Sequence, residues 1–143
     1  MTITSAVCNS FKQEILEAEH NFTASTGNTF NLALYDSSAD LSKSTTVYTT
    51  SEELATTGGY TAKGNALTNV TPVLDSDTAI CDFANTSWTS ASFTARGCLI
   101  FNDDNSDTSV CAIDFGGDKT VTSGTFTIEF PAAAASTAII QIA

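Results

Sequence analysis

The feature that most restricts the fold is a series of strand signals after the N-terminal stretch, beginning with a period-two alternation at residues 30–35 and recurring at short spacing from residue 69 onward. Successive side chains of a strand point to opposite faces of a sheet, so each alternating segment predicts a strand. The predicted strands are residues 30–35, 41–50, 70–74, 78–83, 90–95, 98–101, 109–115, 125–130 and 138–142. Many short strands joined by polar turns predict a mainly β protein, either an antiparallel sandwich or a jelly-roll-like domain.

The turns and the strand ends give further expectations. Glycine and serine predict turns at residues 116–118 and 123–124, and residues 51–67 are expected to form a structured loop. Strand 30–35 is expected to bury one face. Strand 138–142 is β-prone and almost uncharged, so we expect it inside a sheet or paired with another subunit.

The N-terminal stretch has a different period. Val7, Phe11, Ile15 and Leu16 follow one another at three- and four-residue spacings, which predicts one amphipathic α-helix over about residues 5–22. Phe11, Ile15 and Leu16 form a single apolar stripe. We expect this stripe to be buried against the sheet or against a partner subunit.

One domain, residues 1–143, accounts for the whole chain, with the helix leading into a β domain over about residues 29–143. A chain of this length buries a core without a metal or disulfide framework. Apolar residues make up 42% of the chain and charged residues 15%. This balance argues against disorder, which requires high charge and low hydrophobicity.

Acidic residues dominate the charge of the chain, with 16 acidic and 5 scattered basic residues and a net charge of −11. A surface that follows a phosphate backbone needs the opposite sign, so nucleic acid is not an expected partner. No apolar run approaches the ~20 residues that cross a bilayer, so no membrane partner is expected.

The sequence contains no P-loop, no dinucleotide fingerprint and no zinc-type cysteine pair. Nucleophilic catalysis needs a base, and the only histidine, His20, is expected on the polar side or at the end of the helix. Asp103, Asn105 and Asp107 alternate like calcium ligands, but Thr108 stands where such a loop has glycine, so a solvated hairpin loop is expected. We therefore expect no enzyme activity, no catalytic residue, no cofactor and no metal.

Two cysteines are candidates for a crosslink, because Cys98 and Cys111 lie on neighbouring predicted strands. If Phe101 pairs with Thr108, antiparallel counting places Cys98 opposite Cys111, where disulfide geometry is attainable. The default expectation for all four cysteines is nevertheless a reduced, buried thiol.

Several stretches resemble small virion proteins of tailed bacteriophages. They are residues 8–14, 29–35, 87–102, 113–116 and 126–131, together with Gly124. The resemblance spans nearly the whole chain and implies a structural protein of the virion that is assembled in the host cytoplasm. The positions that it carries over are Phe11, Trp88 and Arg96, as buried anchors of an interface or as residues that fix the fold.

The preferred hypothesis from this resemblance is a head decoration, or cement, protein that stabilises the shell. Its partners would be the major capsid protein or other virion subunits, and a homo-oligomer, preferably a trimer, is expected. The interface candidates are Phe11, Ile15, Leu16, Trp88 and Arg96.

The alternative is a tail or fibre component that binds other virion proteins or a host-surface glycan. Its support is the polar loop at residues 58–67 and the aromatic residues Tyr48, Tyr60 and Trp88. For Trp88, however, a core or interface position is favoured over a sugar-stacking platform.

Overall fold

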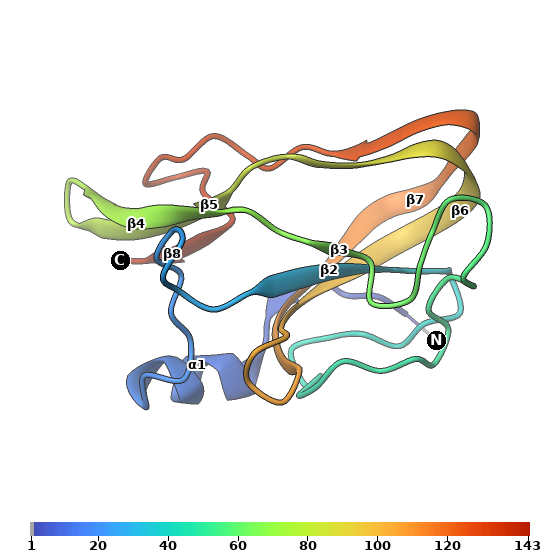
Figure 1. The fold of residues 1–143 in the computed structure, drawn as a ribbon. Helices are drawn as coiled ribbons and strands as arrows, with labels where there is room; N and C mark the ends of the chain where they lie inside the picture. Colours follow the sequence, from blue (N-terminus) through green and yellow to red (C-terminus); the bar gives the residue numbers. More distant parts are fainter. Residues whose placement is uncertain (1) are drawn as a thin grey trace.

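The computed structural model describes residues 2–143, which form two antiparallel sheets that face each other (Figure 1). The larger sheet has five strands in the order β1-β7-β6-β2-β3, and the smaller has three in the order β4-β5-β8. The elements are β1 (Ala6–Val7), α1 (Asn9–Leu16), β2 (Phe30–Tyr35), β3 (Asn65–Ala66), β4 (Asn69–Asp75), β5 (Thr78–Phe83), β6 (Thr86–Asn102), β7 (Thr108–Ile128) and β8 (Ile140–Ile142). The predicted antiparallel, sandwich-like β fold with one N-terminal helix is therefore confirmed.

Strands β6 and β7 form one long hairpin that belongs to both layers. Its backbone pairing runs from Thr86 opposite Ile128 to Asn102 opposite Thr108. The ribbon turns back on itself at the right of Figure 1, so one half lies in the layer of β2 and the other in the layer of β4 and β5. Strand β6 therefore stands where two strands were predicted, at 90–95 and 98–101, and β7 stands where two were predicted at 109–115 and 125–130.

Bulges, rather than turns, occupy the glycine- and serine-rich segments of this hairpin. The turns predicted at 116–118 and 123–124 are wrong, since both segments lie inside β7. The first segment bulges out opposite Arg96. Gly116 (φ 80°) and Ser123 (φ 46°) adopt the left-handed backbone conformation, which tight turns and many bulges both use.

A register shift near the tip of the hairpin moves two cysteines out of alignment. Phe101 pairs with Ser109, one residue beyond the predicted partner, and Cys98 lies opposite Ile113. The predicted alignment of Cys98 with Cys111 is therefore wrong. All four cysteines are free thiols in the structure.

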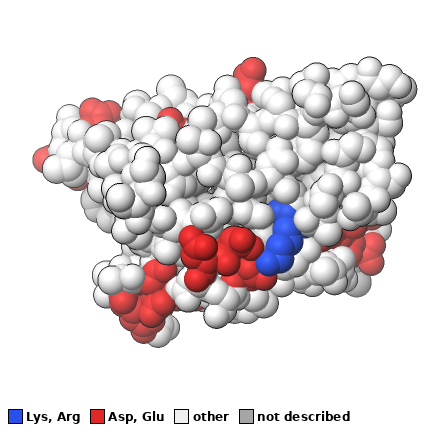
Figure 2. All heavy atoms as spheres, viewed as in Figure 1, with Lys and Arg blue, Asp and Glu red and all other residues white. Residues whose placement is uncertain are grey.

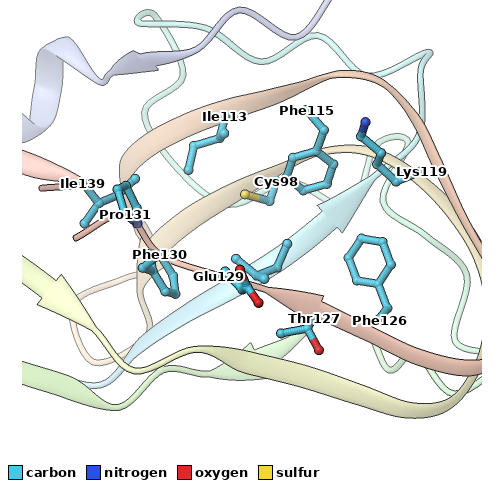
Figure 3. A pocket seen from close by; sticks show the side chains of 11 residues that line it. Cys98, Ile113, Phe115, Lys119, Phe126, Thr127, Glu129, Phe130, Pro131 and Ile139 are labelled. Atoms are coloured by element: carbon cyan, nitrogen blue, oxygen red, sulfur yellow. The ribbon is translucent and has the colours of Figure 1, made fainter. Parts of the chain in front are cut away.

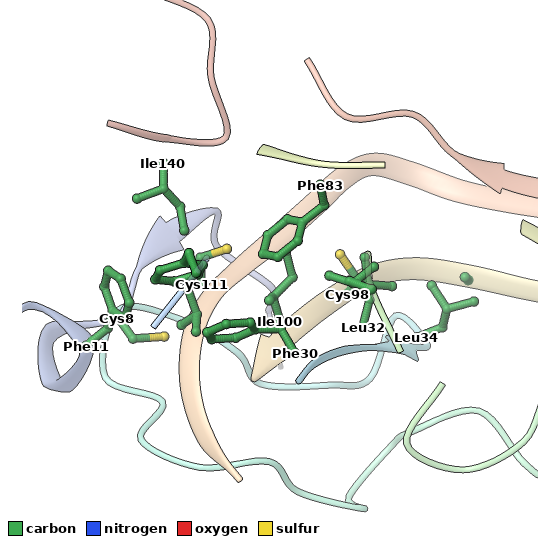
Figure 4. Packing of buried hydrophobic residues seen from close by; sticks show 14 of the residues in the cluster. Cys8, Phe11, Phe30, Leu32, Leu34, Phe83, Cys98, Ile100, Cys111 and Ile140 are labelled. Atoms are coloured by element: carbon green, nitrogen blue, oxygen red, sulfur yellow. The ribbon is translucent and has the colours of Figure 1, made fainter. Parts of the chain in front are cut away.

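Strand β2 is buried on both faces, which corrects the prediction of one buried face. Phe30, Leu32 and Leu34 belong to the main core, where Figure 4 shows Phe30 beside Phe83 of the opposite layer. The other face of β2 contributes to a second cluster with loop residues such as Leu41. The loop after β2 therefore covers the face that the alternation assigned to solvent.

Helix α1 is shorter than predicted and begins later, covering Asn9–Leu16 instead of residues 5–22. Ala6–Val7 form strand β1, which pairs with β7. Ala18 takes a left-handed conformation (φ 61°) just after the helix, where the chain turns away. Neither α1 nor any other helix within residues 2–143 is long and apolar enough to cross a membrane.

Residues 41–50 do not form the predicted strand. Val47 makes an isolated bridge to Thr108, and Leu41 makes another to Ile3. The following segment, residues 51–67, is a loop as predicted, apart from the short β3.

Candidate functional site

One end of the molecule, at the left of Figure 1, carries exposed large apolar side chains on α1 and on the small sheet. Leu16 is 88% exposed, Leu74 73%, Val73 57% and Ile142 54%. Val73 points to the opposite face of the small sheet from its neighbour Leu74, so we call Leu16, Leu74 and Ile142 the apolar end. Single exposed apolar side chains are ordinary, but a contiguous apolar patch marks an interaction surface.

A groove of about 430 Å³ connects the helix side of the apolar end with its sheet side. On the helix side the groove is lined by Ile15, in the last turn of α1, and by Ala18, just after the helix. On the sheet side it is lined by Pro72, Ala79 and Ile142. Ile142 therefore belongs both to the apolar end and to the groove, whose lining also includes the polar residues His20, Asn21 and Thr23.

The apolar end exists because the core-facing side chains of the small sheet continue past the margin of the opposite layer. Leu74, Ala79 and Ile142 are paired neighbours across β4, β5 and β8. Ile142 shares a face with Ile140, two residues earlier, and Ile140 is buried in the main core. Leu74 and Ile142 therefore continue the core-facing row to a place where they remain exposed.

Acidic residues flank the apolar end. Glu17 and Glu19 follow Leu16 along the chain, and Asp75 and Asp77 follow Leu74 at the β4–β5 turn. Figure 2 shows acidic side chains gathered over α1 and the neighbouring loops. An apolar centre with an acidic rim is complementary to a partner that presents apolar side chains beside basic ones.

The structure separates the predicted interface residues instead of bringing them together. Phe11 and Trp88 lie in the main core, and Ile15 is half-buried against it. The burial of Leu16 against the sheet is wrong, while its burial against a partner stays a prediction. Arg96 is half-buried on β6. Of the predicted set, Ile15 and Leu16 remain available at the apolar end.

The aromatic residues that supported glycan binding are largely internal. Trp88 and Tyr60 are both buried, with ring centroids 6.1 Å apart. Tyr48 stacks on Phe101 at a centroid distance of 4.7 Å. Trp88 and Tyr60 therefore offer no open face on which a sugar ring can stack.

Arg96 forms an ion pair with Asp114 across the hairpin. Its Nε donates to Asp114 Oδ1 at 2.7 Å, and the backbone N–H of Gly116 donates to the same oxygen at 3.0 Å. The Arg96 hydrogen bond, followed by that of Gly116, lowers the pKa of Asp114 below its usual value. This pair ties β6 to the bulge of β7 and is a structural contact.

His20 is buried and lies beyond α1, which ends at Leu16, so its expected position on the polar side or at the end of the helix is wrong. Its Nδ1 accepts from the Asn102 amide at 3.1 Å, and its Nε2 donates to Glu14 at 2.6 Å. The ring packs against Phe11 and Phe30. Within residues 2–143 no hydroxyl or thiol hydrogen-bonds to this ring. The lack of a catalytic role stays a prediction.

The acidic loop at residues 103–107 forms ion pairs with a lysine from another loop. Lys63 Nζ lies 3.0 Å from Asp103 Oδ1 and 2.9 Å from Asp107 Oδ2. The backbone N–H of Thr29 also donates to Asp104. Among the described residues, no group of three or more histidine, cysteine or acidic side chains is arranged to hold a metal ion.

Sequence reasoning missed a polar network around Glu53. Its carboxylate accepts from the hydroxyls of Tyr48 (2.5 Å) and Tyr60 (2.7 Å) and from the backbone N–H of Lys63 (2.7 Å). The Tyr60 hydroxyl accepts in turn from the N–H of Leu34 at 3.0 Å. Burial, followed by the nearby Glu53 carboxylate, raises the pKa of Tyr60. This network fastens the loop after β2 to the sheet, and no local sequence pattern indicates it.

No family model, no curated protein and no solved structure matches this chain.

Proposed function

We propose that the protein is a non-enzymatic structural subunit of a tailed-bacteriophage particle, and that the apolar end binds another subunit of that particle. The observation that carries the binding role is the exposure of Leu16 (88%) and Leu74 (73%) beside an apolar groove. Covering a side chain of this size contributes roughly 1.5–3 kcal/mol. The setting in a phage particle is supported by the sequence resemblance.

Head decoration is the specific role that we propose, with the major capsid protein as partner. Sandwich proteins of this size commonly clamp capsid subunits, which is an analogy of fold. Many copies on a symmetric shell add up weak individual contacts, and a protein that binds only the assembled shell stabilises it. The acidic rim of the apolar end suits a capsid surface with basic residues around an apolar patch.

Co-sedimentation with capsids that lack the protein tests this function. We expect the wild type to bind and Leu74→Asp to lose roughly tenfold to a hundredfold in affinity, because the loss of one covered leucine exceeds 1.4 kcal/mol. Leu16→Asp is expected to act in the same direction. Both side chains are exposed in the single chain, so circular dichroism and thermal unfolding should stay as in the wild type.

The matched control is Val47→Asp, which adds the same charge at an apolar side chain that is 45% exposed outside the apolar end. We expect this variant to bind capsids like the wild type. Equal binding by all variants would refute the role of the apolar end. A failure of the wild type itself to bind capsids would refute head decoration.

The tail or fibre alternative differs in where the protein sits. Immunogold labelling of intact particles would place it on the head or on the tail. If the tails are labelled, and if the protein binds purified tails but Leu74→Asp does not, the subunit-binding role is kept. The partner is then a tail protein and not the major capsid protein.

A further inference from the structure

The C-terminal half of β7 is a free sheet edge. Strand β1 pairs with β7 only at Cys111 and Ala112, and from there to Ile128 the described residues provide β6 as its one partner strand. This half of β7 forms the upper margin of the molecule in Figure 1. The N–H groups of Asp114, Gly116 and Ser123 donate to side chains, so the outward backbone groups that another strand can pair with belong to the other residues of this half.

An apolar cleft of about 560 Å³ lies beside this edge, between the two halves of the bent hairpin. Its apolar lining includes Ile128 and also Ile113, Phe115, Phe126 and Phe130, and Figure 3 shows these last four around the opening. These five side chains are only partly buried and pack against the main core. A chain that pairs with the β7 edge would cover them.

The charges along this edge differ from those of the rest of the molecule. The chain carries a net charge of −11, yet residues 120–128 contain no charged side chain. A second copy can therefore approach here without direct like-charge contact, although its surface is acidic elsewhere. A neutral edge beside an apolar cleft is self-complementary.

The two residues that flank the neutral stretch carry opposite charges. Lys119 precedes it and Glu129 follows it, each five residues from Gly124. Both side chains are exposed, and neither forms an ion pair within residues 2–143. When two such edges meet antiparallel near Gly124, the Lys119 end of the neutral stretch in each copy faces the Glu129 end in the other, and the bulge at Ser123 lies at the centre of the contact.

We propose that two copies of this chain associate edge to edge through β7, antiparallel and with a two-fold axis near Gly124. Two Lys119–Glu129 contacts flank the shared edge, and each copy covers part of the other's apolar cleft. This contact is distinct from the apolar end, so it stands whether or not the apolar end binds a capsid. It also differs from the expected trimer, because a two-fold contact closes at two copies.

Charge reversal on both sides of the contact tests the proposal by sedimentation equilibrium at low salt. We expect the wild-type mass to rise with concentration from 14.9 kDa towards twice that value. Lys119→Glu and Glu129→Lys each place like charges together twice, so each should weaken association roughly tenfold. The double variant K119E/E129K restores opposite charges, and its association should return to nearly the wild-type level.

The controls change the same net charge elsewhere on the surface. Lys43→Glu is matched to Lys119→Glu, and Glu52→Lys is matched to Glu129→Lys, and both should associate like the wild type. Thermal unfolding of every variant verifies that the fold is intact, since all four side chains are exposed. Hydrogen exchange should show extra protection of the β7 edge at high concentration.

Several outcomes would overturn the proposal. A wild type that stays monomeric at every concentration would refute self-association, and a trimer would refute the two-fold contact. Single variants that associate like the wild type, or a double variant as weak as the singles, would place the contact elsewhere. None of these outcomes bears on capsid binding by Leu74, which is measured separately.

Discussion

Trp88 lies directly across the β6–β7 hairpin from Phe126, with their ring centroids 6.0 Å apart in a T-shaped arrangement. Trp88 also packs against Phe93 and Tyr60 and is almost fully buried. We expect Trp88→Ala to lower the free energy of unfolding by about 3–5 kcal/mol, because it leaves a large cavity. Urea denaturation measures the loss, and Trp88→Phe should lose less. A Trp88→Ala variant as stable as the wild type that fails to bind its partner would instead make Trp88 an interface residue.

The Glu53 network predicts a second effect on stability. Glu53→Ala leaves the buried Tyr60 hydroxyl without its acceptor, so we expect a loss of roughly 1–3 kcal/mol in the free energy of unfolding. Hydrogen exchange should rise across residues 36–64, the loop that this carboxylate fastens. Glu52→Ala is the control, because Glu52 is exposed and should change stability by less than about 0.5 kcal/mol. An unchanged exchange pattern in Glu53→Ala would show that other contacts hold the loop.

His20 is expected to act through stability and not through chemistry. His20→Ala removes the partner of Glu14 and Asn102, and we expect it to cost roughly 1–3 kcal/mol of folding free energy. Thermal unfolding combined with a binding or infectivity assay checks this. Normal stability and assembly together with a complete loss of function would reveal a catalytic or signalling role that the described contacts do not show.

The Arg96–Asp114 pair predicts a stability difference at acidic pH. The pKa of Asp114 is lowered in the folded chain, mainly by the Arg96 hydrogen bond. An acid of this kind stabilises the fold fully above its unfolded pKa, near 3.8, and the contribution is lost as the pH falls through the lower, folded pKa. The stability gap between wild type and Asp114→Asn should therefore be largest at neutral pH and close under acidic conditions. Arg96→Gln should remove the same pH dependence, and a gap that persists in acid would contradict this assignment.

The cysteines are expected to react slowly while the chain is folded. Burial raises the pKa of Cys81 to about 11 and that of Cys111 to about 12, and it raises the pKa of Cys98 well above the usual value. Little thiolate is therefore present at neutral pH. Mass spectrometry after iodoacetamide treatment should show Cys81, the one cysteine that is not fully buried, labelled first. All four thiols should react after unfolding, and a quantitative Cys98–Cys111 bridge in protein prepared without reductant would contradict the expected free thiols.

Sequence predicted the fold best where β-prone residues follow a clear turn. Residues 78–83 form β5 with the predicted bounds, because a polar turn precedes this largely apolar segment. The hairpin was divided wrongly at Gly116 and Ser123, since a left-handed residue marks either a turn or a bulge. Only the pairing with β6, which the local sequence does not contain, distinguishes the two.

The candidate site was less predictable than the fold. Leu16 was recognised as apolar, but its exposure depends on where the opposing layer ends, which is a tertiary property. Leu74 and Ile142 looked like ordinary strand residues for the same reason. The contacts of Glu14 and Asn102 with His20 join residues far apart in the chain, and no spacing rule predicts them.

The bent β6–β7 hairpin also constrains how the chain folds. The hairpin closes around residues 103–107 and then pairs residues that lie progressively further apart, up to Thr86 with Ile128. Each further pair adds little loop-closure entropy once its neighbours are in place. We expect folding to begin at this tip and to add residue pairs successively along the hairpin. The same process then forms strands of both layers. The growing hairpin then brings the two layers together through contacts between neighbouring pairs. In many all-β proteins the slow step is instead the formation of contacts between residues that are far apart in the chain.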